Sequence, residues 1–515
     1  MQDLSGEDYV KRPSVTMKSV FLRATSFLVG LRYEWACLSL ILILGLVYRL
    51  PPMNRGLGQD ELYTTVNFIQ AGSMWTTMSS NAAFNNHIGY SVMARLCARL
   101  FGNSEWSLRL PALLLGLASL YLFWIFSKPI LTSVGAFVGV LVLALSPPHV
   151  VWSVEARGYS AMIFFTLLSS IFYLRLLRRA SRFDVLGYVL ANVGAIYTHL
   201  YSIFVVAIQF LVFAQLVIST DFAKRAGVNM TSALRRRFCL SLIVTATVSL
   251  VAYLPVAQTM LDDLIARGHG RFDPTFPWAI IQRLSGGEET SITGLMLLVA
   301  VFGGYSLWNS RPLEARYFIA LFIVPVLATW AARPFDLYPR FFAYWLPFYI
   351  TLFVAGVAAL WRLAGSYTKL VMRFLASAAV ATVLIAVIYP WVTTRSVYIP
   401  NEGYREASAA AMLGAHDGVK YCAIGGARSI WRYYIHQPIA TPASLNEMLT
   451  LSQNAGEVRC VYYDASWQSK EQRKIAEFLR QHADWQEIGE LAVFRYVANQ
   501  NTGRTSLHNV KHAGG

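Results

Sequence analysis

The sequence GLGQDELY occupies residues 56–63 and follows the first long apolar run, residues 35–50, almost immediately. It places two adjacent carboxylates, Asp60 and Glu61, beside a segment apolar enough to enter a bilayer. Ionisable side chains at a membrane boundary are costly, and those found there usually serve a function. The pair therefore directs attention to residues that reach the same depth from other parts of the chain.

The composition is that of a protein with many membrane spans. Of 515 residues, 56% are hydrophobic and 14% are charged, whereas soluble domains contain about 25% charged residues. We therefore expect a polytopic α-helical membrane protein with about 11 transmembrane helices and a small C-terminal α/β extracytoplasmic domain. The expected spans are residues 35–50, 108–126, 131–145, 159–177, 185–197, 201–218, 238–260, 291–308, 317–332, 341–361 and 374–392.

The distribution of charge predicts the orientation. Densely basic loops alternate with loops that carry carboxylates, so the positive-inside rule places residues 1–34 in the cytoplasm. No cleavable signal peptide is expected, because no small-residue cleavage site follows the first apolar run. The first external loop, residues 51–107, contains two expected interfacial helices, 61–74 and 90–100. Basic inner loops also account for the net charge of +16, and we expect no binding of nucleic acid.

The composition changes after residue 398, where polar residues become frequent. Short apolar segments alternate with polar helical ones, a pattern typical of an α/β domain with a largely parallel sheet. Cys422 and Cys460 both fall in this part, and their spacing does not indicate a metal site. The expected strands are 421–424, 458–463 and 491–497, and the expected helices are 429–436 and 470–482. The chain thus divides into a cytoplasmic segment 1–34, a transmembrane domain 35–394, an extracytoplasmic domain 395–498 and a disordered tail 499–515.

The predicted topology gathers polar side chains at the outer ends of the spans. Carboxylates, histidines and arginines from distant parts of the chain then share one depth, which is typical of an active site or a substrate pathway. No metal-ligand spacing such as HExxH and no nucleotide-binding loop is present, so we expect no cofactor and assign no metal ligands. The acidic pair alone leaves metal dependence open. The gathered residues are Asp60, Glu61, Asn86, His87, Glu155, Arg157, Tyr159, His199, Tyr201, Asp262, Asp263 and Arg340.

Several of these residues also have a structural interpretation. Asp60 is as well explained by an N-cap of an interfacial helix as by catalysis. His87 alone fits an interfacial side chain, and Arg157 and Arg340 fit anchors that extend their charged ends to the membrane surface. It is the combination of these residues at one depth that indicates a function.

The order of several short motifs resembles that of the C-type (GT-C) polyprenyl-phosphate-dependent membrane glycosyltransferases. The closest groups are the protein O-mannosyltransferases and the lipid A aminoarabinose transferases. As in that family, an acidic pair, Asp60-Glu61, follows the first span. The resemblance covers roughly residues 35–360, and each motif is weak alone, but their order makes the set specific. The further motifs are NNHIGY at 85–90, LFGNSEWSLRLP at 100–111, SPP at 146–148, EARGYS at 155–160, YTHLY at 197–201 and PRFF at 339–342.

The resemblance implies an inverting glycosyltransferase on the outer face of the plasma (inner) membrane. It would move a sugar from a polyprenyl-phosphate donor to a hydroxyl of a lipid, glycan or protein acceptor, in contact with membrane lipids. Asp60 would be the general base, with Glu61 beside it in the catalytic pair. Arg157 and Arg340 would stabilise the leaving phosphate. The other substrate-binding side chains would be Asn86, His87, Glu155, Tyr159, His199 and Tyr201.

The chain departs from the aminoarabinose-transferase pattern at two places. Residues 86–88, Asn-His-Ile, stand where that group often has a lysine or a proline-rich run. Tyr159 stands near the place of a second acidic residue, for which Glu155 is the candidate substitute. These differences leave the sugar open, and lipid A, another glycolipid, a polysaccharide and a protein all fit as acceptors.

Two other classes of function are alternatives. A secondary transporter or flippase of a charged or lipid-linked substrate would be expected to show paired repeats and charges near mid-membrane, whereas the candidate charges here lie at one edge. A receptor or assembly scaffold built around the C-terminal domain would leave the Asp60-Glu61 motif unexplained.

Overall fold

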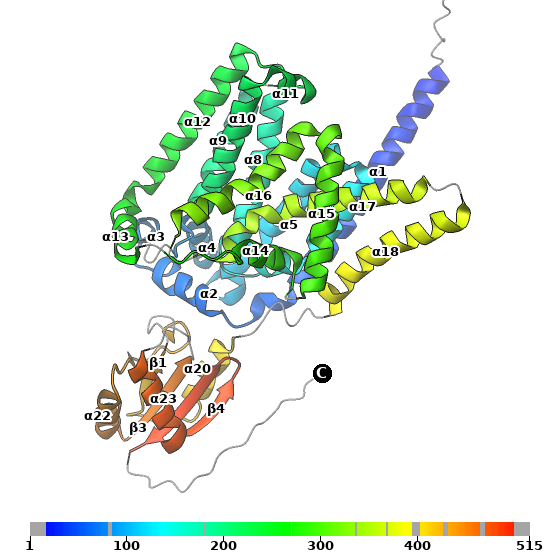
Figure 1. The fold of residues 1–515 in the computed structure, drawn as a ribbon. Coiled ribbons are helices and arrows are strands. Elements are labelled where there is room, and N and C mark those ends of the chain that lie inside the picture. The colour runs from blue at the N-terminus through cyan, green and yellow to red at the C-terminus, as the bar shows by residue number, and fades with distance from the viewer. Residues whose placement is uncertain are drawn as a thin grey trace, which may run out of the picture.

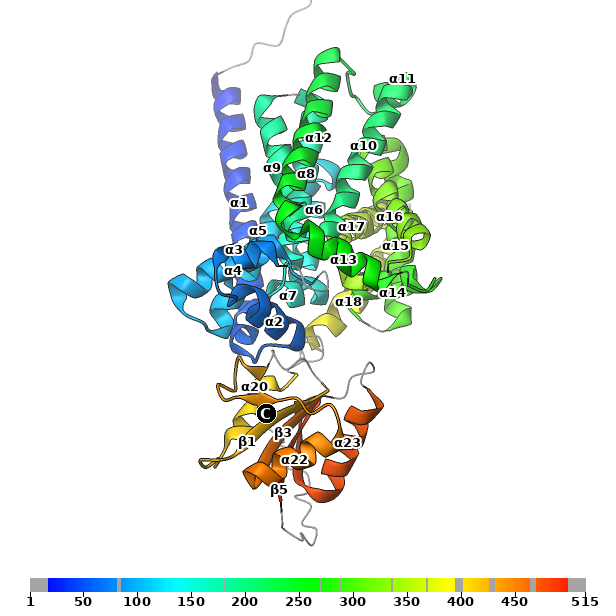
Figure 2. The same ribbon diagram turned by 90° about the vertical axis from the view of Figure 1, so that its left-hand side faces the viewer.

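The chain forms a bundle of long helices with a small sheet domain at one end of it, beyond α2 (Gln59–Thr64) (Figures 1 and 2). The computed structural model describes residues 17–80, 85–179, 181–268, 270–287, 289–334, 337–366, 369–393, 402–425, 431–463 and 469–498. Predictions for residues 1–16, 395–401 and 499–515 lie outside the described residues.

Long apolar helices confirm the polytopic α-helical fold, and a helix occupies each position at which a span was expected. Among the described residues, nine helical segments are long and apolar enough to cross a membrane, or ten if one bent pair is a single span. The expected count of about 11 also included α9 (Arg182–Thr198), which at 17 residues is shorter than each of these segments. The other long helices are α1 (Met17–Arg49), α5 (Glu105–Leu131), α8 (Tyr159–Arg179), α10 (Ile203–Ile218), α12 (Ser232–Tyr253), α15 (Thr290–Ser310), α16 (Pro312–Ala332), α17 (Leu346–Gly365) and α18 (Leu370–Thr393).

The third expected span is the bent pair. Its two parts, α6 (Ser133–Leu145) and α7 (Pro147–Ser153), meet at 62°. Proline at the start of α7 has no N–H to continue the helical hydrogen bonding. The fully buried Arg49 of α1 donates to the carbonyl oxygen of Ala144 at 3.0 Å and lies 2.7 Å from Nδ1 of His149. The guanidinium thereby gives a hydrogen bond to a carbonyl oxygen that the break leaves without a helical partner. In the membrane interior such backbone groups must find a partner within the protein.

In the described part of residues 51–107, the expected first external loop, α2, α3 (Met74–Ser79) and α4 (Ile88–Phe101) stand where two interfacial helices were expected. The helix α2 (Gln59–Thr64) continues through a π-helical turn to Ile69 and then stops, and α3 (Met74–Ser79) follows after a bend. The single helix expected at 61–74 is therefore wrong at residues 70–73, where the chain bends. The cause is the buried Arg95 of α4 (Ile88–Phe101), which donates to carbonyl oxygens of residues 69, 71 and 72 and so stabilises the bend.

Several shorter helices link the long ones. The segment after α12 is helical, so Asp262 and Asp263 lie on an exposed helix that continues beyond the expected span 238–260. The linking helices are η1 (Pro51–Asn54), η4 (Leu200–Ser202), α11 (Thr220–Arg225), η5 (Leu254–Val256), α13 (Ala257–Arg267), α14 (Phe276–Ser285) and η6 (Pro339–Trp345).

The C-terminal part contains a five-stranded mixed sheet in the order β2-β1-β3-β5-β4. The strand β1 is parallel to its neighbours β2 and β3, whereas β5 is antiparallel to its neighbours β3 and β4. The expectation of a largely parallel sheet is therefore wrong for half of the strand pairs. The strand β4 was missed because its DWQEI sequence is polar and mostly exposed. The elements are α20 (Tyr404–Met412), β1 (Lys420–Ile424), β2 (Ile439–Ala440), α22 (Leu445–Ala455), β3 (Glu457–Tyr463), α23 (Lys470–His482), β4 (Asp484–Ile488) and β5 (Leu491–Val497).

The helix expected at 429–436 is not formed in its described part. Residues 426–430 lie outside the described residues, and the chain after Trp431 forms a turn. The helix expected at 470–482 is α23 without change.

A disulfide joins Cys422 and Cys460, which face each other on the neighbouring parallel strands β1 and β3. Such bonds persist mainly in oxidising compartments outside the cytoplasm.

We expect replacement of both cysteines by serine to lower the free energy of unfolding of this domain. The entropy of closing a loop across 38 positions corresponds to about 4 kcal/mol.

Thermal melting of the double variant measures the loss of stability. Mass spectrometry after alkylation tests whether the disulfide is present. In denatured protein Cys422 and Cys460 should resist alkylation until a reductant is added, whereas Cys37 and Cys239, which are free thiols, should be alkylated without it. Alkylation of Cys422 and Cys460 in untreated protein would contradict the bond.

Candidate active site

Asp60 lies on the first turn of α2 and forms an ion pair with Arg340, 280 positions later in the sequence. The distance from Asp60 Oδ2 to Arg340 Nη2 is 2.9 Å, and the two side chains are 40% and 35% exposed. The N-cap of α2 is Gly58, so Asp60 does not have the capping position that local sequence allowed. An acid and a base from distant segments therefore meet at a point that a substrate can reach.

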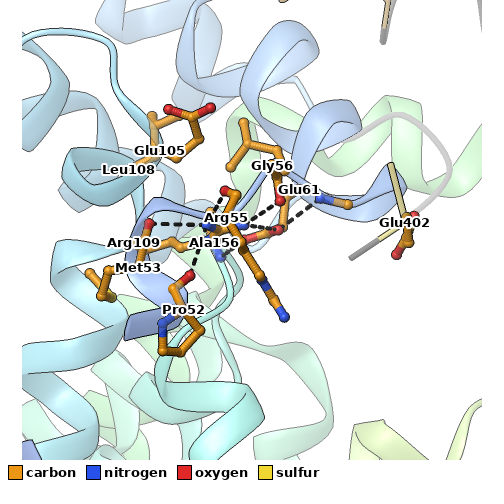
Figure 3. A network of polar contacts seen from close by, with 12 residues as sticks. Pro52, Met53, Arg55, Gly56, Glu61, Glu105, Leu108, Arg109, Ala156 and Glu402 are labelled. Carbon is orange, nitrogen blue, oxygen red and sulfur yellow. Dashed lines mark hydrogen bonds and ion pairs between the residues drawn. The ribbon is translucent and has the colours of Figure 1, made fainter. Parts of the chain in front are cut away.

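Glu61, the neighbour of Asp60, is buried and fully hydrogen-bonded. Its two carboxylate oxygens accept four hydrogen bonds, from Arg109 Nε at 2.7 Å, Arg109 Nη2 at 2.6 Å, the amide of Ala156 at 2.6 Å and the amide of Gly58 at 2.9 Å. Burial alone would raise the pKa of Glu61, but the charge and hydrogen bonds of Arg109 lower it to about 2. Glu61 thus remains a carboxylate and links the first external loop, α5 and the α7–α8 loop (Figure 3).

Arg109 completes this network from the start of α5. Its side chain is fully buried, and besides Glu61 it donates to the carbonyl oxygens of four residues, which are Pro52, Met53, Arg55 and Gly56. One guanidinium therefore fixes the whole segment between α1 and α2. In the sequence Arg109 falls within the motif at 100–111, and its only signal of a role is its position at the outer end of an expected span.

Arg157 makes a second connection to α2. It is buried, donates to Thr64 Oγ1 at 2.7 Å and to Asn85 Oδ1 at 2.7 Å, and lies 3.4 Å from Nε2 of His87. Its guanidinium is 5.9 Å from the centre of the Tyr159 ring. Arg157 is thus held inside the protein by polar partners and is not a membrane-surface anchor.

Two buried histidines lie next to Arg157 with their rings in contact. The ring centres of His87 and His199 are 4.8 Å apart. Nδ1 of His87 accepts a hydrogen bond from the amide of Gly158 at 2.8 Å, and Nδ1 of His199 accepts one from the amide of Tyr201 at 3.3 Å. Burial, and then the positive charge of Arg157, lower the pKa of His87 well below its usual range and that of His199 to about 3.

Both imidazoles are therefore neutral, and an amide donating to Nδ1 leaves the proton on Nε2. They can donate hydrogen bonds to an oxygen ligand but cannot supply a net charge. Gly158 is required for this arrangement, because a Cβ at that position would lie 2.7 Å from Nδ1 of His87.

The remaining predicted residues surround this group at different depths. Tyr159 is buried, and within the described part of the chain its hydroxyl has no hydrogen-bond partner. Tyr201 packs its ring against His199 and Phe341 at 5.9 and 5.0 Å. Glu155 is half-buried, and burial raises its pKa despite the nearby positive charges of Arg55, Arg283 and Arg340.

Asn86 has a structural environment. Its amide nitrogen donates to the carbonyl oxygens of Thr77 and Ser80 at 2.9 and 2.6 Å, and its oxygen accepts from Ser91 Oγ at 2.7 Å. These hydrogen bonds join the end of α3 to the start of α4. Over the described residues, no group of three or more histidine, cysteine or acidic side chains is arranged to hold a metal ion.

The family model for dolichyl-phosphate-mannose-protein mannosyltransferases matches residues 87–253. No curated protein sequence matches the chain. The fold is similar to that of ArnT from Cupriavidus metallidurans in the apo state, with a TM-score of 0.58, 13% identity and coverage of 92% of this chain and 99% of that one. The structure of the same protein bound to undecaprenyl phosphate matches with a TM-score of 0.55, 14% identity and coverage of 90% and 98%.

A more distant match is the oligosaccharyltransferase of Archaeoglobus fulgidus in the apo form, with a TM-score of 0.53, 11% identity and coverage of 83% of this chain and 69% of that one. The chain thus has the fold of the C-type membrane glycosyltransferases. The family model and these structures confirm the resemblance that the order of motifs suggested.

We expect Glu61 and Arg109 to stabilise the protein only as a pair. Replacing either one by alanine leaves the other buried and unpaired, which costs about 3–5 kcal/mol. The double variant E61A/R109A should be more stable than the sum of the single losses predicts. The matched control is Lys474→Ala, which removes an exposed pair with Glu471 and should leave the melting temperature nearly unchanged.

Thermal melting of the purified variants in detergent measures these changes. Because the pKa of Glu61 is about 2, below the usual 4.5, its stabilising effect is complete above about pH 4.5 and is lost as the pH falls toward 2. The difference in melting temperature between wild type and E61Q should therefore be constant from pH 5 to pH 8. Additive single losses would contradict the coupling.

Proposed function

We propose that the protein is an inverting glycosyltransferase that moves a sugar from a polyprenyl phosphate to a hydroxyl of a lipid, glycan or protein. The single observation that carries the proposal is the ion pair between Asp60 and Arg340, in which both side chains remain partly exposed. A carboxylate at this point can accept the proton of an acceptor hydroxyl, and the adjacent guanidinium can bind a phosphate.

The chemical step follows from this placement. The acceptor oxygen forms a bond to the anomeric carbon while the bond from that carbon to the phosphate oxygen breaks, and the hydroxyl proton passes to Asp60. Negative charge develops on the leaving polyprenyl phosphate, which Arg340 and Arg157 stabilise as preformed donors. In the free protein Arg340 pairs with Asp60; a bound phosphate competes for the same guanidinium and frees the carboxylate of Asp60 to contact the acceptor hydroxyl.

The other residues bind or position in this scheme. Glu61 is saturated by four donors and holds Asp60 in place, without contact to the reacting atoms. The Nε2–H groups of His87 and His199 and the hydroxyl of Tyr159 donate to phosphate or sugar oxygens. The remaining three have lesser parts: Glu155 accepts from sugar hydroxyls, Tyr201 supplies an aromatic wall, and Asn86 supports the loop that carries His87.

The similar proteins support a lipid phosphate as the donor. One ArnT structure contains undecaprenyl phosphate, and the Archaeoglobus fulgidus enzyme AglB has been described in complex with an inhibitory peptide and a dolichol-phosphate. Together with the mannosyltransferase family model, these leave a hexose or a pentose as the sugar. The reaction would take place on the outer face of the plasma (inner) membrane, with the N-terminus in the cytoplasm. The disulfide of the C-terminal domain supports that orientation.

The experiment that tests this function separates transfer from transport. Purified protein in detergent is given a radiolabelled lipid extract of its own cells as donor and acceptor, and in parallel it is reconstituted into proteoliposomes with a fluorescent lipid phosphate. Label should move to a new glycolipid or protein, and the lipid phosphate should stay in its leaflet. Lipid movement without any transfer would overturn the proposal in favour of a flippase.

We expect Arg340→Ala and Arg157→Ala each to weaken the binding of undecaprenyl phosphate about tenfold or more, because each removes charge-assisted hydrogen bonds worth about 1.5–3 kcal/mol. Arg340→Lys, which keeps the charge, should lose less. The matched control is Arg271→Ala, an exposed arginine in the loop before α14. Binding is measured by native mass spectrometry of lipid titrations, and equal affinity in all four variants would exclude the arginines as phosphate ligands.

A further inference from the structure

A carboxylate from the C-terminal segment contacts the helix that carries Asp60. Oε2 of Glu402 accepts a hydrogen bond from the amide of Gln59 at 2.8 Å, although the two residues are 343 positions apart. Gln59 is the first residue of α2 and Asp60 the second. The first amides of a helix have no partner within it, so an external acceptor there fixes where the helix begins.

The closeness of this contact explains a glycine. A Cβ on Gly58 would lie 2.7 Å from Oε1 of Glu402. The backbone of Gly58 has φ −76° and ψ 171°, a conformation that any residue adopts. Glycine is therefore needed at this position for the approach of Glu402 and not for the course of the chain.

Other residues of the C-terminal domain contact the same segment. The hydroxyl of Tyr434 accepts from the amide of Leu57 at 2.8 Å, and Arg405 donates to the carbonyl oxygen of Asn54 at 2.8 Å. Leu57 lies in one buried cluster with Tyr404 and Trp431 of the domain. Through these contacts the C-terminal domain packs directly against the segment of the membrane bundle that precedes Asp60.

The segment that carries Asp60 is thus fixed from two sides. From the membrane bundle, Arg109 of α5 holds it through Glu61, and Glu402 lies on the opposite side of Glu61 from Arg109 (Figure 3). Two opposed sets of contacts determine the position of a short helix better than one, and a displacement of about 1 Å can slow a positioned reaction about a hundredfold.

We propose that residues 402–498 belong to the catalytic unit, with Glu402 as a positioning residue that sets the place of Asp60 relative to Arg340. This inference rests on the proposed glycosyl transfer for its consequence, but the contact itself is testable without activity. The contact needs only an acceptor oxygen. Burial, with the nearby charges of Glu61, Glu490 and Asp60, raises the pKa of Glu402 to about 7, and a neutral acid or an amide accepts the same bond.

The first test compares Glu402→Ala with Glu402→Gln. The alanine variant should lower kcat about tenfold to a hundredfold, with less than about a threefold change in KM for the polyprenyl-phosphate donor. The glutamine variant, which keeps an acceptor oxygen, should retain kcat within about threefold. Glu471→Ala, an exposed carboxylate of α23, is the control and should behave as wild type. Full kcat in E402A would overturn the positioning role.

The second test is independent of turnover. Gly58→Ala should destabilise the protein and speed hydrogen exchange in the peptide that contains α2, as E402A does. Because both changes break one contact, adding G58A to E402A should have little further effect. Gly72→Ala is the matched control, since a Cβ there meets nothing within 4 Å. Additive effects of G58A and E402A, or unchanged exchange in α2, would exclude the contact.

These two tests separate the failures. If wild-type protein transfers no sugar but G58A and E402A remain coupled in melting and exchange, the proposed function fails. The contact between Glu402 and α2, which joins the C-terminal domain to the membrane bundle, then stands. If transfer occurs and the variants are uncoupled, the function stands and this inference is wrong.

Discussion

The buried ion pair between Glu61 and Arg109 is the interaction on which the Asp60 end of the bundle depends. Two charges removed from water are stable only when each is fully hydrogen-bonded, and here the surrounding backbone supplies the missing partners. Two amides complete the shell of Glu61, and four carbonyl oxygens complete that of Arg109. The need to satisfy this pair therefore determines the path of the chain between α1 and α2.

Asp60 has the opposite environment, although it is adjacent in sequence. It is 40% exposed, and its ion-pair partner among the described residues, Arg340, is itself accessible. One carboxylate of the pair is thus committed to structure while the other remains free to exchange partners with a substrate. Neutral histidines nearby add hydrogen-bond donors without adding charge, because the positive charge of Arg157 and burial both oppose their protonation. The site concentrates its positive charge in arginines, which cannot lose it.

Hydropathy predicted the helices and their order well, because a membrane span is a property of its own residues. The details that depend on distant partners were not predictable. Arg95 ends the first interfacial helix from another helix, and Arg109 pairs with Glu61 across 48 positions. Glu402 carried no local signal, and the disulfide of Cys422 depends on the register of β1 with β3. In the candidate site, the motifs located Asp60, Arg157 and Arg340, but only the structure distinguishes the bonded Glu61 from the accessible Asp60.

The central claim is that Asp60 is the base of a sugar transfer, and the most direct measurement is turnover by Asp60→Asn with donor binding recorded on the same preparation. The account predicts that the folded variant binds undecaprenyl phosphate at least as tightly as wild type, because Arg340 is then unpaired, and transfers sugar about a hundredfold more slowly or worse. A folded D60N variant that transfers sugar at the wild-type rate would contradict it.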